Sequence, residues 1–258
     1  MTTTTITNPA RTDLASERVR ADRTSDSSTH DGVHAAPDSV DRPSRHWALA
    51  GVGAGVAGVG AIVSSGLVDA VYDPAIQGDA GAIADKLATQ TEAAFVFHTF
   101  ALVSAVLLVV FAAGLLRRLR HGLAERGVAD SLLPTAAFAG LAGTAVVQVI
   151  GTSLDTEFLF GLPHQDVLVD SNVVMYGHFI GTVPWCWVLA GLAGLALHLA
   201  GRAGAVPRWV GRVGLVLGGL TLLAGISPLQ YVAGMVGPVW LLVTALGFAL
   251  GDKAYRTA

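Results

Sequence analysis

The sequence predicts an all-α fold: a polytopic membrane protein with a bundle of six transmembrane helices and a disordered N-terminal tail. Of its 258 residues, 52% are hydrophobic and only 14% are charged, whereas soluble proteins carry roughly 25% charged residues. Most of the charge lies before Trp47 or in short gaps after it. This distribution excludes a water-soluble α/β enzyme, a disulfide-stapled secreted domain and a nucleic-acid-binding protein.

Residues 1–46 form a separate polar segment, rich in Thr, Ser, Asp and Arg and without a periodic apolar face. Such a segment cannot bury enough apolar area to offset its chain entropy, so we predict a disordered cytoplasmic tail. No apolar core follows a basic start, so the segment is not a signal peptide. The tail either regulates the protein or binds a partner, or it is an extension without a function of its own.

Six apolar runs follow the tail, and each is long enough to span a bilayer, because about 20 apolar residues cross roughly 30 Å of hydrocarbon. Uniform apolarity without alternation favours helices over barrel strands. We therefore predict a six-helix transmembrane domain over 47–250 and a short cytoplasmic C-terminus over 251–258. The runs are Trp47–Tyr72, Ala94–Leu116, Leu132–Leu154, Val173–Ala200, Trp209–Ile226 and Leu229–Leu250.

Charge and aromatic residues predict how these helices cross the membrane. If the tail is inside, every basic residue except Lys86 lies on the inner side. The positive-inside rule then predicts a multi-pass protein of the plasma (inner) membrane with both termini cytoplasmic. The outer segments carry the acids Asp69, Asp73, Asp79, Asp85, Glu92, Asp155, Glu157, Asp166 and Asp170. Aromatic residues, which favour the headgroup boundary, lie near helix ends at Trp47, Tyr72, Phe95, Tyr176, Trp209 and Tyr231.

The connections between the runs carry local predictions. Asp79 is expected to cap a short outer helix whose apolar residues, such as Ile83 and Leu87, share one face. A second long outer loop is predicted over 156–172. The short link at 227–228 makes the last two helices antiparallel neighbours, and Pro184 and Pro238 should kink the runs that contain them.

Glycine pairs with GxxxG spacing occur in four of the runs, and this spacing lets helices pack closely. The pairs serve either packing within the chain or a surface for a homo-oligomer or a membrane partner. The lipid bilayer is the other expected partner, and no nucleic acid is expected. The pairs are Gly51/Gly55, Gly177/Gly181, Gly214/Gly218 and Gly247/Gly251.

Polar residues follow single faces of several runs. Thr144, Gln148, Thr152 and Asp155 are spaced to share one helical face, and His178, Thr182 and Cys186 repeat every four residues. In the predicted orientation these groups lie in the outer half of the membrane. An unpaired polar group in hydrocarbon costs several kcal/mol, so each should face protein or water.

These polar faces predict an outward-facing polar cavity that binds or translocates a small polar solute or ion, with proton coupling as one form of that function. The predicted ligand-binding residues are Asp69, His98, Gln148, Thr152, Asp155, His178 and Thr182. In an alternative interpretation these groups only hydrogen-bond one another between helices. The protein would then be a non-catalytic membrane scaffold or partner-docking subunit.

No motif indicates catalysis, so no catalytic residue is predicted. The GxGxxG match at Gly53 lies inside an apolar run, without the strand that a dinucleotide site requires. No HExxH, GxSxG or P-loop spacing occurs, and the lone Cys186 cannot form an internal disulfide.

The histidines leave a third alternative, a membrane redox protein that binds haem or a metal. His98 and His178 are at similar depth and could ligate a haem iron from both sides, or a divalent metal together with His164 or Asp166. A second pair, His121 and His198, is too far away for two haems within the bilayer, and His121 is expected in a loop. The sequence leaves the cofactor and any metal unknown.

The arrangement resembles the uncharacterised six-span integral membrane proteins of high-GC bacteria. The resemblance is one of architecture, over Trp47–Leu250, and of Gly/Ala-rich spans interrupted by proline. It implies the membrane and the number of helices, and no site residue follows from it.

Overall fold

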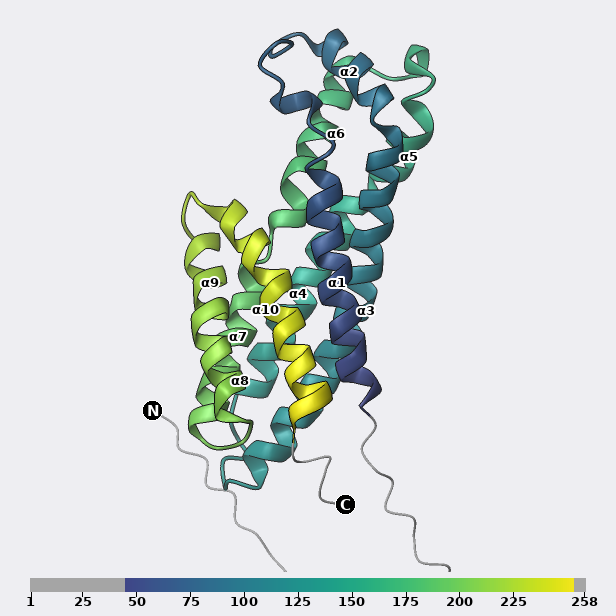
Figure 1. Ribbon diagram of the computed structural model, residues 1–258. Helices are drawn as coiled ribbons and strands as arrows, with labels where there is room; N and C mark the ends of the chain where they lie inside the picture. The colour runs from purple at the N-terminus through teal and green to yellow at the C-terminus, as the bar shows by residue number, and fades with distance from the viewer. Residues whose placement is uncertain (1–44, 253–258) are drawn as a thin grey trace, which may run out of the picture. The chain divides into compact units, whose positions relative to one another are not determined.

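The computed structural model describes residues 45–252, and every regular element in that range is a helix (Figure 1). The predicted tail, apart from Arg45 and His46, and residues 253–258 lie outside the described residues. The elements are α1 His46–Ser65, η1 Ala70–Tyr72, α2 Ala80–Thr89, α3 Thr91–Ala124, α4 Leu133–Ser153, α5 Asp155–Gly161, η2 Gln165–Val167, α6 Asp170–Thr182, η3 Val183–Trp185, α7 Val188–Arg202, α8 Arg208–Val213, η4 Gly214–Gly218, α9 Gly219–Gly225 and α10 Gln230–Gly251.

Five helical stretches are long and apolar enough to cross a membrane, which confirms the all-α class and a multi-pass membrane protein. They are His46–Ser65, Thr91–Ala124, Leu133–Gly161, Asp170–Arg202 and Gln230–Gly251. The predicted fifth run is also helical, but its helix contains a π-helical turn, η4, between α8 and α9. It is not among the five, so the predicted number of six spans is not confirmed.

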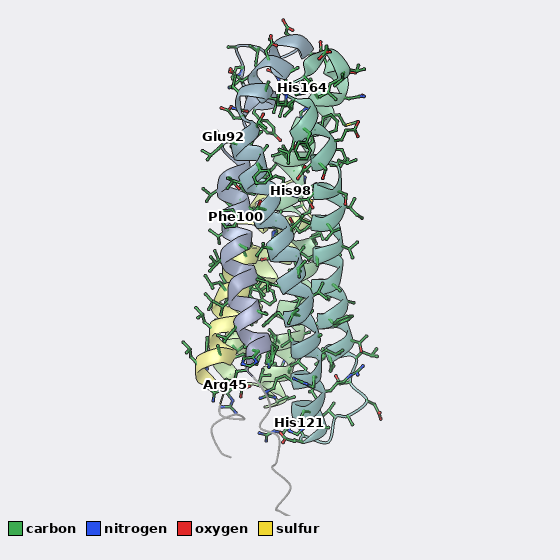
Figure 2. All side chains as sticks on the ribbon, turned by 90° about the vertical axis from the view of Figure 1, so that its right-hand side faces the viewer. Arg45, Glu92, His98, Phe100, His121 and His164 are labelled. Carbon is green, nitrogen blue, oxygen red and sulfur yellow. The ribbon has the colours of Figure 1, made fainter. Side chains whose placement is uncertain are left out.

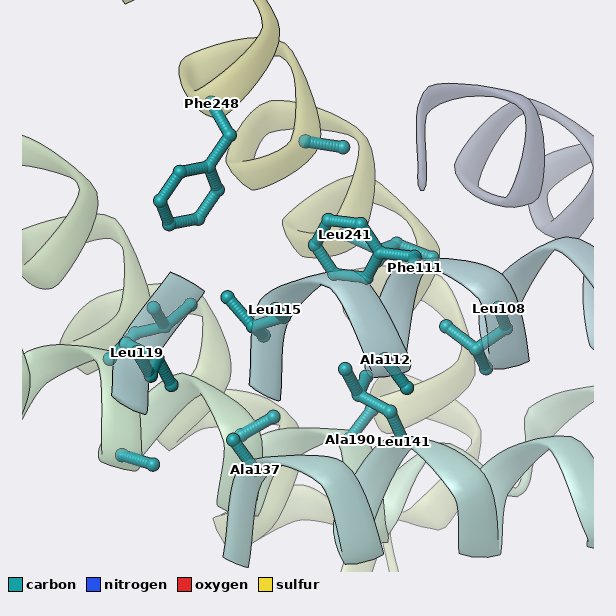
Figure 3. Close-up of a cluster of buried hydrophobic side chains, with 14 of the residues drawn as sticks. Leu108, Phe111, Ala112, Leu115, Leu119, Ala137, Leu141, Ala190, Leu241 and Phe248 are labelled. Carbon is teal, nitrogen blue, oxygen red and sulfur yellow. The ribbon is translucent and has the colours of Figure 1, made fainter. Parts of the chain in front are cut away.

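The helices pack around an apolar core (Figure 3). α1 packs against α3 and α10, α3 packs against α4, and α4 packs against α7. Phe111 of α3, Leu141 of α4 and Leu241 of α10 are fully buried in this core. Small residues between the large ones let the helix backbones approach each other, as is usual where apolar lipid provides no hydrophobic drive for association.

All four glycine pairs face neighbouring helices of the same chain. A Cβ on Gly55 would lie 2.9 Å from the Leu242 backbone of α10, and one on Gly218 would lie 2.6 Å from Gly194 Cα of α7. Gly51 faces Phe111, Gly181 faces the Tyr72 ring, and Gly247 faces Trp209. These pairs therefore set interhelical distances within the bundle, and an oligomer through glycine faces stays a prediction.

The longest helices exceed the thickness of a bilayer. The 34 residues of α3 span about 51 Å at 1.5 Å per residue, whereas the hydrocarbon layer is roughly 30 Å thick. The stretch of α3 without a charged or titratable side chain is only 99–116. We therefore expect the part of α3 before this stretch to extend beyond the layer, on the side away from Arg117.

The extending segments form a second unit of packing, which we call the cap: residues 66–98 and 155–182. Figure 1 shows α2, α5 and α6 beyond the level at which α9 meets α10. The cap has an apolar core of its own, in which Leu87 of α2, Phe97 of α3 and Tyr176 of α6 are buried. Asp79 caps α2 by accepting a hydrogen bond from Ala82 N at 3.0 Å, as predicted.

Four boundaries differ from the prediction, and one of them is the end of α3, which lies at Ala124 rather than at Leu116. The run Val173–Ala200 is not one helix, because α6 ends at Thr182 and α7 begins only at Val188, with Pro184 in η3 between them. Cys186 is therefore not on one helical face with His178 and Thr182. The first helix ends at Ser65 rather than at Tyr72, and the predicted loop 156–172 contains α5 and η2. The short link at 227–228 does make α9 and α10 packed neighbours.

A buried ion pair joins the C-terminal end of α10 to α3 at the arginine-rich end of the bundle. The Arg118 guanidinium donates to both carboxylate oxygens of Asp252, at 2.7 and 3.1 Å, and to Ala205 O at 3.1 Å. Both side chains are buried. Bidentate geometry and the third acceptor offset the cost of removing the guanidinium charge from water.

Substitution of Asp252 by alanine should strongly destabilise the protein, because it leaves the buried Arg118 charge without a counterion. We expect a loss of about 3–5 kcal/mol, measured by thermal unfolding in detergent. Glu125→Ala, which removes an exposed carboxylate paired with His121 at 3.1 Å at the same end, should cost roughly 1 kcal/mol or less. Equal effects of the two variants would contradict the structural role of Asp252.

Candidate functional site

The structure places the seven predicted binding residues in separate environments. Gln148 and Thr152 are buried between helices: Gln148 Nε2 donates to Val183 O at 3.3 Å, and the Thr152 hydroxyl donates to Gln148 O at 2.9 Å. Val183 O, next to Pro184, also accepts the Cys186 N–H at 3.0 Å, so Gln148 is its second donor and ties α4 to the point where the helix is interrupted. These two buried residues help to pack α4 against η3.

His98 and Asp155 form a pair at the base of the cap. His98 Nδ1 lies 3.0 Å from Asp155 Oδ2, and the Asp155 side chain has an exposed fraction of 0%. Figure 2 shows His98 between Glu92 and Phe100 along α3. The pair joins α3 to α5. All four residues of the predicted polar face, Thr144, Gln148, Thr152 and Asp155, are buried.

The hydroxyl of Tyr176 lies beside the same carboxylate. The Tyr176 hydroxyl and Asp155 Oδ1 are both buried, and neither has a hydrogen bond of good geometry in the described part of the chain. The Tyr176 ring stacks on Phe158 with centroids 4.4 Å apart. The three groups thus connect α3, α5 and α6 around one buried carboxylate.

Asp69 belongs to a different cluster, at the surface of the cap. Lys86 Nζ lies 2.9 Å from Asp69 Oδ1 and donates to Asp73 Oδ2 at 2.8 Å. Gln90 Nε2 also donates to Asp69 Oδ1, at 2.6 Å. These hydrogen bonds, that from Lys86 above all, hold the pKa of Asp69 below its ordinary value, so Asp69 is ionised at neutral pH.

His178 and Thr182 lie on α6, and both interact with Tyr72. The His178 side chain is exposed, and its ring meets the Tyr72 ring edge-on with centroids 6.1 Å apart. Within residues 45–252 no group of three or more His, Cys, Asp or Glu side chains is placed to hold a metal ion. His121 is helical rather than in a loop, because α3 continues to Ala124.

A cavity of about 270 Å³ lies where α1 ends and α10 begins, next to Asp69. It brings together five elements of the chain. The end of α1, η1, α6, η3 and the first turn of α10 contribute the lining residues Ser65, Gly66, Val68, Asp69, Tyr72, Gly181, Trp185 and Tyr231. Of the predicted binding residues, this cavity contains Asp69.

Three aromatic side chains dominate the cavity. The Trp185 and Tyr231 rings meet edge to face with centroids 5.4 Å apart. The Tyr72 hydroxyl interacts with Tyr231 and Thr182, and burial raises the pKa of Tyr72 to about 12, so this phenol is neutral at physiological pH. Gly181 is required at this point, because a Cβ there would collide with the Tyr72 ring.

The bundle is tightly packed beneath the cavity. A Cβ on Gly58 would lie 3.0 Å from the Trp187 ring and 3.1 Å from Pro238, and one on Gly234 would lie 2.6 Å from Trp185 Cα. Gly58 is seven residues before Ser65, about 10 Å deeper along α1. The cavity is therefore a pocket at one end of the bundle, with close-packed helices below it.

No family model, curated protein or solved structure matches this chain. The resemblance to six-span membrane proteins of high-GC bacteria therefore stays a prediction.

Only part of this pocket is predictable from the sequence. Tyr72 and Tyr231 are among the predicted boundary aromatics and Asp69 is a predicted binding residue, but Trp185 was not predicted. The position of Trp185 directly after Pro184 was the available indication, since a proline in a long apolar run ends a helix and reorients the residues that follow.

Removal of the buried carboxylate should loosen the cap. Asp155→Ala leaves the His98 ring without its hydrogen-bond partner and removes the carboxylate beside the Tyr176 hydroxyl, at a cost of roughly 1–3 kcal/mol. We expect faster amide hydrogen exchange in α5 and α6, and a smaller change for Asp155→Asn, which keeps an acceptor oxygen. Glu157→Ala, an exposed carboxylate on the same helix, is the control, and equal exchange in both alanine variants would contradict the role of Asp155.

Proposed function

We propose that this protein binds a small organic cation at the outer surface of the inner membrane, in the pocket of Tyr72, Trp185, Tyr231 and Asp69. One observation carries the proposal: three aromatic side chains and an ionised carboxylate surround a cavity of about 270 Å³. Aromatic faces attract cations through the ring quadrupole, and clusters of such rings recognise weakly hydrated ammonium groups. The proposal thereby specifies the predicted small polar solute or ion as a positively charged one and assigns its binding to this pocket.

The Asp69 carboxylate can accept a hydrogen bond from a ligand. Both side-chain donors to Asp69, from Lys86 and Gln90, reach Oδ1, which leaves Oδ2 for another donor. Lys86 lies between two carboxylates, Asp69 and Asp73, so the cluster keeps one net negative charge. A cation in the pocket would therefore contact aromatic rings on one side and the net negative charge of the Asp69, Lys86 and Asp73 cluster on the other.

The charge of the cap supports a cationic ligand. Nine acids and a single base, Lys86, occupy the segments that the positive-inside rule places outside. Such a surface raises the local concentration of cations. Binding is favoured over translocation, because Gly58, Trp187 and Pro238 are closely packed below the pocket.

If the cap faces outward, the helix over 208–225 serves as the sixth membrane span. The helix over 208–225 has 18 residues, about 27 Å, and its uncharged part lies beside α7 and α10. Counted as a sixth span, it gives an even number of crossings and places both termini in the cytoplasm. All basic residues except Lys86 then face the cytoplasm.

Choline and its uncharged isostere 3,3-dimethyl-1-butanol test the pocket directly. Titration calorimetry of the protein in lipid nanodiscs should show choline binding at least roughly ten-fold tighter than the alcohol, because only the cation interacts with the ring quadrupoles. Trp185→Leu should weaken binding of both probes. Asp69→Asn should weaken only that of choline.

Phe160→Leu, which removes an exposed aromatic ring elsewhere in the cap, should leave both affinities unchanged. Equal affinity for the two probes, or unchanged choline binding in a folded Trp185→Leu protein, would refute a cation-binding pocket. Tyr231→Leu provides a second variant if Trp185→Leu lowers the yield of folded protein.

Labelling of introduced cysteines tests the orientation independently. In a Cys186→Ser background, Asp85→Cys places a thiol on the exposed side of α2, and Ala129→Cys places one between α3 and α4. A membrane-impermeant maleimide should label intact cells at 85 and not at 129, and both positions after lysis. The reverse pattern would show that the cap faces the cytoplasm.

A further inference from the structure

A second cavity, of about 290 Å³, lies at the opposite, arginine-rich end of the bundle, between α7 and α8. It is lined by His198, Gly201, Arg202, Arg208, Gly211 and Arg212. No acidic residue contributes to this lining. The three arginines are exposed and form no ion pair within residues 45–252, whereas Arg118 nearby is neutralised by Asp252.

The cavity is formed by two rows of basic side chains above glycines. His198 and Arg202 are four residues apart on α7, and Arg208 and Arg212 are four apart on α8, so each pair occupies one face of its helix. Between the rows the helices nearly touch: a Cβ on Gly201 would lie 3.1 Å from Gly211 Cα. Glycines here keep the floor of the groove open, so that a ligand can reach the basic groups from both helices.

The depth of the groove corresponds to the headgroup layer. Charge-free helix begins directly beyond it, after Arg212 on α8 and before Arg202 on α7. One helical turn, about 6 Å, separates Arg208 from Arg212. The groove thus extends from the surface of the membrane to the start of the hydrocarbon, where lipid phosphates lie.

We infer that this groove binds the phosphate of an anionic phospholipid headgroup. Arginine donates paired N–H groups that match phosphate oxygens, and basic pockets between transmembrane helices are typical sites for anionic headgroups. His198 Nδ1 lies 3.3 Å from Gly211 O. If Nδ1 carries the hydrogen and donates it to this carbonyl, the ring is held at the edge of the groove. The inference does not depend on the cation pocket in the cap.

Short-chain lipids separate the headgroup from the acyl chains. Thermal unfolding of the full chain in detergent is followed with dihexanoyl phosphatidylglycerol, dihexanoyl phosphatidylcholine, glycerol phosphate and inorganic phosphate. We expect phosphatidylglycerol to stabilise the protein at concentrations at which the other three do not. Equal stabilisation by phosphatidylcholine would show a site for acyl chains, and equal stabilisation by glycerol phosphate or inorganic phosphate a site for soluble phosphates; either result overturns the inference.

Two matched double variants locate the site. Arg208→Gln/Arg212→Gln should weaken phosphatidylglycerol binding by about five-fold per arginine removed. Arg117→Gln/Arg120→Gln removes two exposed charges at the same end of the bundle but outside the groove, and should leave binding nearly unchanged. A similar loss in both double variants would show general attraction to a basic surface and would overturn the site.

Discussion

The thickness of the hydrocarbon layer determines how this chain is organised. Backbone amides cannot remain unpaired in lipid, so every crossing segment must be helical, and about 20 residues fill the layer. α3 contains 34 residues, more than the layer can accommodate, so we expect its excess to extend past the membrane. The extending turns of α3 and α6, joined by α2 and α5, form the cap with its own apolar core.

Polar and aromatic groups gather where the cap meets the bundle. The buried pair of His98 and Asp155 joins α3 to α5, while Lys86 and Gln90 hold Asp69 at the rim of the aromatic pocket. The pocket exists because α6 and α7 do not form one continuous helix: the chain is interrupted between them at η3. That interruption turns Trp185 towards Tyr231, so a break in secondary structure creates the proposed binding surface.

Hydropathy and charge predicted the membrane class, three of the six runs within a few residues, and the capped helix that starts after Asp79. They did not predict the depth of the polar residues, because the apolar core of the cap continues the hydropathy of the spans without a gap. The run that begins at Val173 lies within the candidate span Asp170–Arg202, but hydropathy did not predict that its first part, α6, packs with α2 and α5 and ends before α7. The convergence of Tyr72, Trp185 and Tyr231 depends on tertiary contacts among η1, η3 and α10, which periodicity does not encode.

The depth of α6 tests the central claim, that the cap lies outside the hydrocarbon layer, most directly. Met175 is apolar and 60% exposed, and it lies about 10 Å before Thr182 along α6. A spin label at Met175→Cys in a Cys186→Ser background, in reconstituted vesicles, should be relaxed by a water-soluble nickel chelate more than by oxygen. A label at Val106→Cys on α3 should show the opposite preference. Strong relaxation by oxygen at position 175, equal to that at 106, would place α6 in lipid and contradict the account.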